Sequence, residues 1–204
     1  MRSTLTLLAL TICTLLAASV HAEEATSAAA GPTPAEMEAI MAAYMEAATP
    51  GPEHAKLAEM AGTYSCTTKM RMDPNGEWME STATETIEPM LGGRFLHMHV
   101  VGAPGPMMPE GFEGAGIFGY NNGEKRYEQV WVDTMGTLTL FMTGTADDQG
   151  VITLEGSYTC PYMKIPLHQR WVMHPSKDGF MIEMYGPDMS GNEYHMGTVT
   201  GVRK

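Results

Sequence analysis

The sequence predicts an all-β fold, an antiparallel up-and-down barrel of about ten strands behind a short N-terminal helical segment. From Gly62 to the C-terminus, stretches of alternating apolar and polar residues recur, and a period of two is typical of strands with one buried face. Turn-forming segments such as Asn121-Asn122-Gly123 separate them. No helix-length periodic segment lies between these stretches, which excludes parallel strands joined by crossover helices. So long a meander tends to close into a barrel, because closure removes its unpaired edges.

The N-terminus has the pattern of a secretory signal peptide, which we assign to residues 1–22. Arg2 supplies the basic start, and the apolar stretch from Leu5 to Ala18 is short for a transmembrane span. Val20-His21-Ala22 then offers a small residue before the cleavage point. We therefore expect an exported protein, periplasmic or secreted, without a membrane anchor. Residues 23–33 show no periodicity and are predicted to be a flexible leader.

Residues 34–60 are predicted to form two N-terminal helices ahead of a barrel domain at 61–204. Thr33 and Glu36 have the spacing of a capping box, and Pro34 occupies the first helical position. The apolar residues that follow recur at helical spacing, at Met37, Ile40, Met41, Tyr44 and Met45. Thr49-Pro50-Gly51-Pro52 ends this helix, and a second, shorter one follows at 53–60.

The barrel strands are predicted from the alternation and from the turns between them. Their expected bounds are 62–72, 78–88, 94–101, 114–121, 126–133, 136–144, 151–159, 167–174, 180–186 and 193–202. The one long connection, from Gly102 to Gly111, is rich in proline and glycine and has Met107-Met108 at its middle. We expect it to be a loop at one mouth of the barrel.

The charge of the chain argues against two classes of binding partner. The formal net charge is −12, without any Lys/Arg cluster, so binding to nucleic acid or an anionic membrane is not expected.

Cys66 and Cys160 are the cysteines beyond the signal peptide. Export favours a disulfide between them. The meander, however, places them roughly 20 Å apart, and a bridge needs Cα atoms within about 7 Å, so two free thiols are favoured.

Several short motifs, taken together, resemble a known family. They include Pro52-Glu53-His54, Gly62-Thr63-Tyr64, Gly92-Gly93-Arg94-Phe95, Gly119-Tyr120-Asn121 and Trp131-x-Asp133-x-Met135. Over residues 50–204 the chain is similar to a bacterial family of unknown function whose members look like calycin barrels, the group of lipocalins and fatty-acid-binding proteins. The resemblance implies a calycin-like barrel with a lumen. It implies no established activity and supplies no catalytic residues.

The resemblance also implies a structural contact at the floor of the barrel. Calycin barrels commonly begin with Gly-x-Trp, and an Arg of the last strand lies over that indole. The matching residues here are Gly62, Tyr64 and Arg203. Tyr in place of Trp weakens a cation–π contact without abolishing it.

The leading functional hypothesis is a binding module that holds a small apolar or amphipathic molecule in its lumen. A barrel of about eight strands already has room for one small ligand, and the diameter grows with strand number. An aromatic wall with a few polar groups is typical of ligand cavities, although ordinary barrel interiors have the same composition. The candidate lining residues are Phe95, Tyr127, Gln129, Trp131, Asp133, Trp171 and Met184.

Two other hypotheses stay open. His97 and His99 share one strand face and could bind copper or zinc with a third ligand, for which the candidates are His168, His174 and His195. The 20 methionines would suit copper, but core packing accounts for them better. A cavity enzyme has little support, because no nucleophile elbow, HExxH motif or phosphate loop occurs. A binding protein without a catalytic residue or cofactor is therefore favoured, in an oligomeric state that the sequence does not specify.

Overall fold

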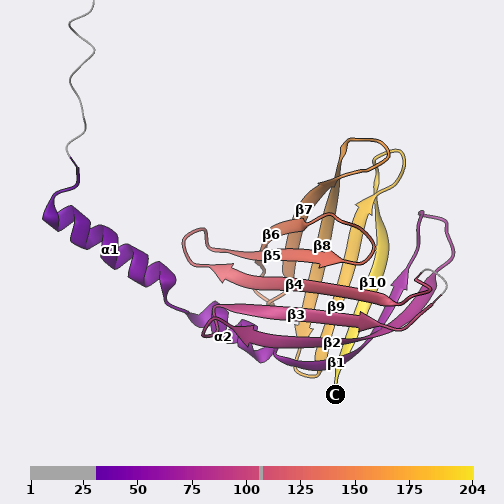
Figure 1. Ribbon diagram of the computed structural model, residues 1–204, viewed down its shortest axis with the longest axis horizontal. Helices are drawn as coiled ribbons and strands as arrows, with labels where there is room; N and C mark the ends of the chain where they lie inside the picture. The colour runs from indigo at the N-terminus through magenta and orange to yellow at the C-terminus, as the bar shows by residue number, and fades with distance from the viewer. Residues whose placement is uncertain (1–30, 106–107) are drawn as a thin grey trace, which may run out of the picture. The chain divides into compact units, whose positions relative to one another are not determined.

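The computed structural model describes residues 31–105 and 108–204, and it contains the predicted barrel (Figure 1). Ten strands form one closed antiparallel barrel, in which sequence neighbours pair and β1 also pairs with β10. The all-β fold class with N-terminal helices is therefore confirmed. The proposed signal peptide, the leader up to residue 30 and Met107 lie outside the described residues.

The observed elements follow the predicted ones closely. The helices are α1 (Pro34–Ala48) and α2 (Pro52–Glu59). The strands are β1 (Gly62–Met70), β2 (Met79–Met90), β3 (Phe95–Gly102), β4 (Phe112–Asn121), β5 (Arg126–Asp133), β6 (Leu140–Ala146), β7 (Ile152–Thr159), β8 (Pro166–Ser176), β9 (Gly179–Pro187) and β10 (Glu193–Arg203). The largest difference is the start of β6. Asp133 Oδ1 accepts the Met135 N–H at 2.9 Å in the turn that follows β5, and β6 begins only at Leu140.

The chain divides into two compact units, residues 1–42 and residues 43–204, and the barrel belongs to the second. The predicted capping box of α1 is present, since Thr33 Oγ1 accepts the Glu36 N–H at 3.3 Å and Glu36 accepts the Thr33 N–H at 2.7 Å. No residue of α1 is buried. Within the described ranges, neither helix has the length and hydropathy of a membrane span.

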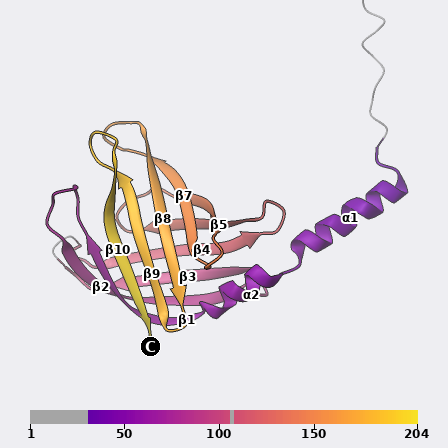
Figure 2. The same ribbon diagram turned by 180° about the vertical axis from the view of Figure 1, so that it is seen from behind.

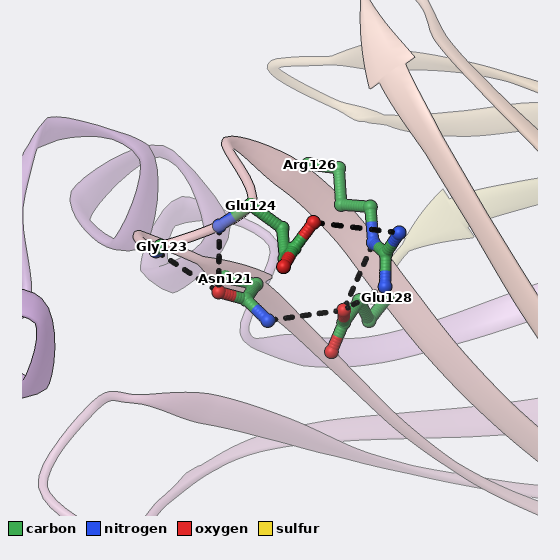
Figure 3. A network of polar contacts seen from close by, with 5 residues as sticks. All are labelled: Asn121, Gly123, Glu124, Arg126 and Glu128. Carbon is green, nitrogen blue, oxygen red and sulfur yellow. Dashed lines mark hydrogen bonds and ion pairs between the residues drawn. The ribbon is translucent and has the colours of Figure 1, made fainter. Parts of the chain in front are cut away.

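The turn between β4 and β5 is held by its own side chains (Figure 3). Asn121 Oδ1 accepts the N–H groups of Gly123 and Glu124, each at 3.0 Å, and Asn121 Nδ2 donates to Glu128 at 3.1 Å. Arg126 adds an ion pair to Glu128 at 3.0 Å. An Asn side chain that bonds the backbone two residues on mimics a turn, which explains why this segment closes the hairpin.

The barrel has two unlike ends, which Figures 1 and 2 show from opposite sides. At the closed end the odd-numbered strands begin, and α2 packs there against the barrel. At the other end, the mouth, the odd-numbered strands end and longer loops connect them to the even-numbered strands. The fully buried large side chains are Tyr64, Leu96, Phe118, Met142 and Leu154.

Candidate functional site

The closed end is sealed by the predicted contact between the first and last strands. Tyr64 pairs with Arg203 in register, and the guanidinium carbon lies 4.9 Å from the centroid of the tyrosine ring. Arg203 also donates to the carbonyl of Ala61 at 2.6 Å and to that of Glu59 at 2.8 Å, which satisfies oxygens left free at the end of α2. Gly62 leaves room for the guanidinium, because a Cβ there would collide with Arg203 Nη1.

Tyr127, a predicted lining residue, belongs to this packed end. It is 3 % exposed, and its hydroxyl donates to the Glu53 carboxylate of α2. That bond, together with the one from Lys56, holds the pKa of Glu53 below its usual value, while burial and the same carboxylate raise the pKa of Tyr127. Tyr127 therefore anchors α2 over the barrel.

Trp131 and Trp171 lie close together on the inner face of the barrel. Their ring centroids lie 6.3 Å apart and the rings meet edge to face at 72°. Trp131 Nε1 donates to Asp133 at 2.9 Å, and Trp171 Nε1 donates to Gln169 at 3.2 Å. Both indoles pack against the core yet stay only partly buried. Part of the surface of each indole is therefore accessible to solvent.

Glycines shape the wall beside these indoles. Gly116 pairs with Trp131 in register, and a Cβ on Gly114 or Gly116 would lie 2.6 Å or 2.9 Å from the indole of Trp131. Met184 pairs both with Trp171 and with a glycine of β10, Gly197, and a Cβ on Gly197 would lie 3.0 Å from the Met184 methyl group. Met184 is only partly buried and lies beside Trp171 on the inner face of the barrel.

Gln129 lies between the two halves, on the same face of β5 as Tyr127 and Trp131. It is 2 % exposed, and its Oε1 has no hydrogen-bond partner among residues 31–105 and 108–204. A buried acceptor left unpaired costs about 1–3 kcal/mol. This oxygen is therefore a buried acceptor that the described residues leave unpaired.

Glu85 is a buried carboxyl group that the sequence analysis does not single out. It is 6 % exposed, and the Cys66 thiol donates to its Oε2 at 3.8 Å. Burial raises the pKa of Glu85 to about 7, and burial together with the charge of Glu85 raises the pKa of Cys66 to about 12. A signal was present, since Ala83 and Ile87 share the strand face of Glu85 and are apolar. Cys66 and Cys160 are both free thiols, as expected.

The expectation that Phe95 points inward is wrong. β3 turns Leu96 and Met98 into the core, where they are 2 % and 4 % exposed, while Phe95 is 36 % exposed. On the outer face Phe95 covers Gly119, its partner in register. The alternation was ambiguous here because Phe95 and Leu96 are both apolar, so either residue fits the inward face.

The histidines of the metal hypothesis do not converge. His97 and His99 lie on the outer face with ring centroids 6.5 Å apart, and His99 Nε2 lies 2.9 Å from Glu113. His195 lies on β10 beside the ring of Tyr185. The other candidates, His168 and His174, pair with carboxylates, Glu155 and Glu183. In the part of the chain that the structure describes, no three His, Cys, Asp or Glu residues are placed to hold a metal ion.

A hollow of about 600 Å³ lies outside the lumen, within residues 43–204. Its lining residues are Ala43, Glu46, Ala47, Thr49, Pro50, Gly51, Asn122 and Lys125. The Asn122 amide is already engaged, since its Nδ2 donates to the carbonyls of Ala47 at 3.0 Å and Thr49 at 2.8 Å. Because it has no aromatic wall and no buried polar group, we assign the candidate site to the lumen.

The closed meander with a helix over one end defines a calycin-like β-barrel protein. A solved structure with this fold is that of Rv2717c from M. tuberculosis, which is 16 % identical and matches with a TM-score of 0.56, covering 76 % of this chain and 99 % of that chain. At this identity the likeness shows the fold alone. Residues 49–203 match the model of the family described as Protein of unknown function (DUF1579), and the chain belongs to this family. The resemblance is thereby confirmed, and no curated protein matches the chain.

Proposed function

We propose that this protein is an exported binding protein whose lumen takes up a small apolar or amphipathic molecule through the mouth. The observation that carries the proposal is the contrast along the inner face of the barrel. Phe118 and Leu154 on the inner face are 0 % exposed, whereas Trp131 and Trp171, which face the same lumen, are only partly buried. Partly buried indoles beside a few polar groups are typical of a ligand cavity.

The energetics of such a site are sufficient for useful affinity. A ligand that removes about 300 Å² of apolar surface from water gains about 7 kcal/mol at about 25 cal/mol per Å². Lost translational and rotational freedom offsets part of this gain. The indole rings add edge-to-face or stacked contacts with any aromatic ligand. Because this cost is subtracted from the gain, we expect a net binding free energy of about −4 to −6 kcal/mol, which corresponds to dissociation constants from about millimolar to tens of micromolar.

The test is a titration with neutral fluorescent probes, Nile red and N-phenyl-1-naphthylamine, which brighten in apolar surroundings. We expect saturable binding, and Trp131→Ala should weaken it at least about tenfold, or about 1.4 kcal/mol. Trp78→Ala is the matched control, because Trp78 is 47 % exposed and lies before β2, outside the lumen. The proposal fails if neither probe binds below about millimolar concentration, or if the two variants bind alike.

Export is part of the proposal and is supported by the basic, apolar and small-residue segments of residues 1–22. Expression of the full chain in a Gram-negative host tests it. We expect the protein in the periplasmic fraction, with an N-terminus at or near Glu23. A cytoplasmic product that retains Met1–Ala22 would contradict export and leave the lumen proposal untouched.

A further inference from the structure

We infer that the lumen selects ligands that carry a hydrogen-bond donor, such as an alcohol or an amine, and disfavours carboxylates. The inference rests on the proposed function and names the chemical class of the ligand. Two features of the inner face carry it: a buried acceptor without a partner, and acidic side chains with no basic counterpart among the described strand residues outside the closed end.

The first feature is the side-chain oxygen of Gln129. Its Oε1 has no hydrogen-bond partner in the described residues, although Gln129 is only 2 % exposed. Gln129 stands one inward position deeper than Trp131 on β5, so a molecule entering beside the two indoles meets its amide next. Across the sheet its register partner is Met142, whose flexible thioether can shift to admit a polar group.

Four aromatic donors of the inner face are already used within the protein. The indole N–H groups of Trp131 and Trp171 donate to Asp133 and Gln169. The hydroxyls of Tyr64 and Tyr127 donate to Met60 O and Glu53. The lumen therefore offers a buried acceptor, while these four aromatic donors are not available to a ligand.

The second feature is the sign of charge on the inner face. Glu85 and Asp133 point inward, and Glu85 is 6 % exposed. Among the described strand residues, the one Lys or Arg on the inner face is Arg203, at the closed end. Lys69, Arg126 and Arg170 lie on the outer face and pair there with Glu80, Glu128 and Glu193.

Two other arginines lie near the ends of the barrel but are held in place. Arg203 is fixed over Tyr64 at the closed end. Arg71, at the mouth, donates to the carbonyls of Pro74 and His195 and lies 4.6 Å from the ring of Trp78. A carboxylate in the lumen would thus lose its hydration without gaining a cation, and burying an unpaired charge is strongly unfavourable.

The experiment is displacement of Nile red from the full mature chain by ligands with one ten-carbon chain and different head groups. We expect decanol and decylamine to displace the probe at concentrations at least about tenfold lower than decanoate or methyl decanoate. Methyl decanoate is the critical comparison, because it is neutral and can only accept hydrogen bonds. Decylamine against decanol separates the contribution of positive charge from that of donation alone.

Gln129→Leu removes the side-chain amide, and with it the acceptor, and replaces it with an apolar side chain of similar size. We expect it to abolish the preference for decanol over methyl decanoate and to leave Nile red binding intact. Glu155→Gln, an exposed outer-face change on β7, is the control and should keep the preference. Should Gln129→Leu not fold, the ranking of the four ligands on the wild-type protein still decides.

The outcomes separate the two proposals. If Nile red binds but decanoate displaces it as well as decanol does, donor selection is wrong and the lumen remains a binding site. If the wild type shows the ranking but Gln129→Leu keeps it, the recognised acceptor is not Gln129 and the inference is overturned as stated. If neither Nile red nor N-phenyl-1-naphthylamine binds, the proposed function itself fails.

Discussion

The two ends of this barrel consist of the same ten strands but differ in how their side chains are packed and hydrogen-bonded. At the closed end, Arg203, Tyr64 and α2 satisfy one another's polar groups and the core side chains are buried. Away from that end, Trp131 and Trp171 meet edge to face on the inner face of the barrel and are only partly buried. Under the proposed function, the residues that stabilise the barrel and those that bind the ligand are different residues. Substitutions at the two ends should therefore have different consequences.

The largest effect is expected in the closed half, from Phe118→Ala. Phe118 is 0 % exposed and stacks on Tyr127 with ring centroids 5.7 Å apart. Deleting a buried phenyl ring costs about 3–5 kcal/mol through lost burial and the cavity left behind. Urea unfolding followed by circular dichroism measures this loss. A change below about 1 kcal/mol would show that the closed half is not the packed core we describe.

A pH-dependent effect follows from Glu85. Burial raises its pKa in the folded protein to about 7, above the value of about 4.3 for an unfolded Glu. The folded state therefore binds more protons between these two values, so stability falls as pH rises through this window and is level above it.

Glu85→Gln is neutral at every pH and lacks this loss. We expect its free energy of unfolding, relative to wild type, to improve by roughly 3 kcal/mol between pH 4 and pH 8. Urea unfolding of both proteins at several pH values across that range measures the difference. Parallel pH profiles of the two proteins would mean that Glu85 titrates normally and is not enclosed.

Arg203→Ala tests the seal of the closed end. It removes the cation from the Tyr64 ring and two hydrogen bonds to the carbonyls of Glu59 and Ala61 at the end of α2. We expect a loss of about 1–2 kcal/mol in the free energy of unfolding. Arg203→Lys, which keeps the charge but not the fork of donors, should recover part of it. An unchanged urea-unfolding midpoint for Arg203→Ala would show that this contact does not stabilise the closed end.

The smallest effect on stability is expected at the mouth, from Met184→Ala. Met184 is only partly buried beside Trp171, so its removal exposes little new surface and leaves a space already open to solvent. We expect at most about 1 kcal/mol of destabilisation, well below a core truncation. Nile red affinity should nevertheless fall, because the probe loses its apolar contact with the Met184 side chain. A loss of stability as large as that of Phe118→Ala would show that Met184 is packed as tightly as the closed half.

Much of the fold could be read from the sequence because its signals are local. Hairpin turns such as Asn121-Asn122-Gly123 and the alternation along β5 determine both strand order and the inward face of Trp131. Phe95 could not be placed, since its neighbour Leu96 is equally apolar. Which polar atoms find partners depends on contacts between distant strands. For this reason the unpaired Gln129 oxygen and the Glu85–Cys66 pair became visible only in three dimensions.

The pairing of β1 with β10 has a consequence for how the chain folds. Each of the other strand pairs joins sequence neighbours, but this one joins Tyr64 to Arg203. Its ladder therefore closes a loop that spans nearly the whole barrel domain, and such long-range pairing is slow because loop-closure entropy is lost before contacts form. Until β10 arrives, β1 and β9 both present open edges that can pair with other chains. A chain truncated before Glu193 should consequently aggregate rather than fold, however well its nine earlier strands are made.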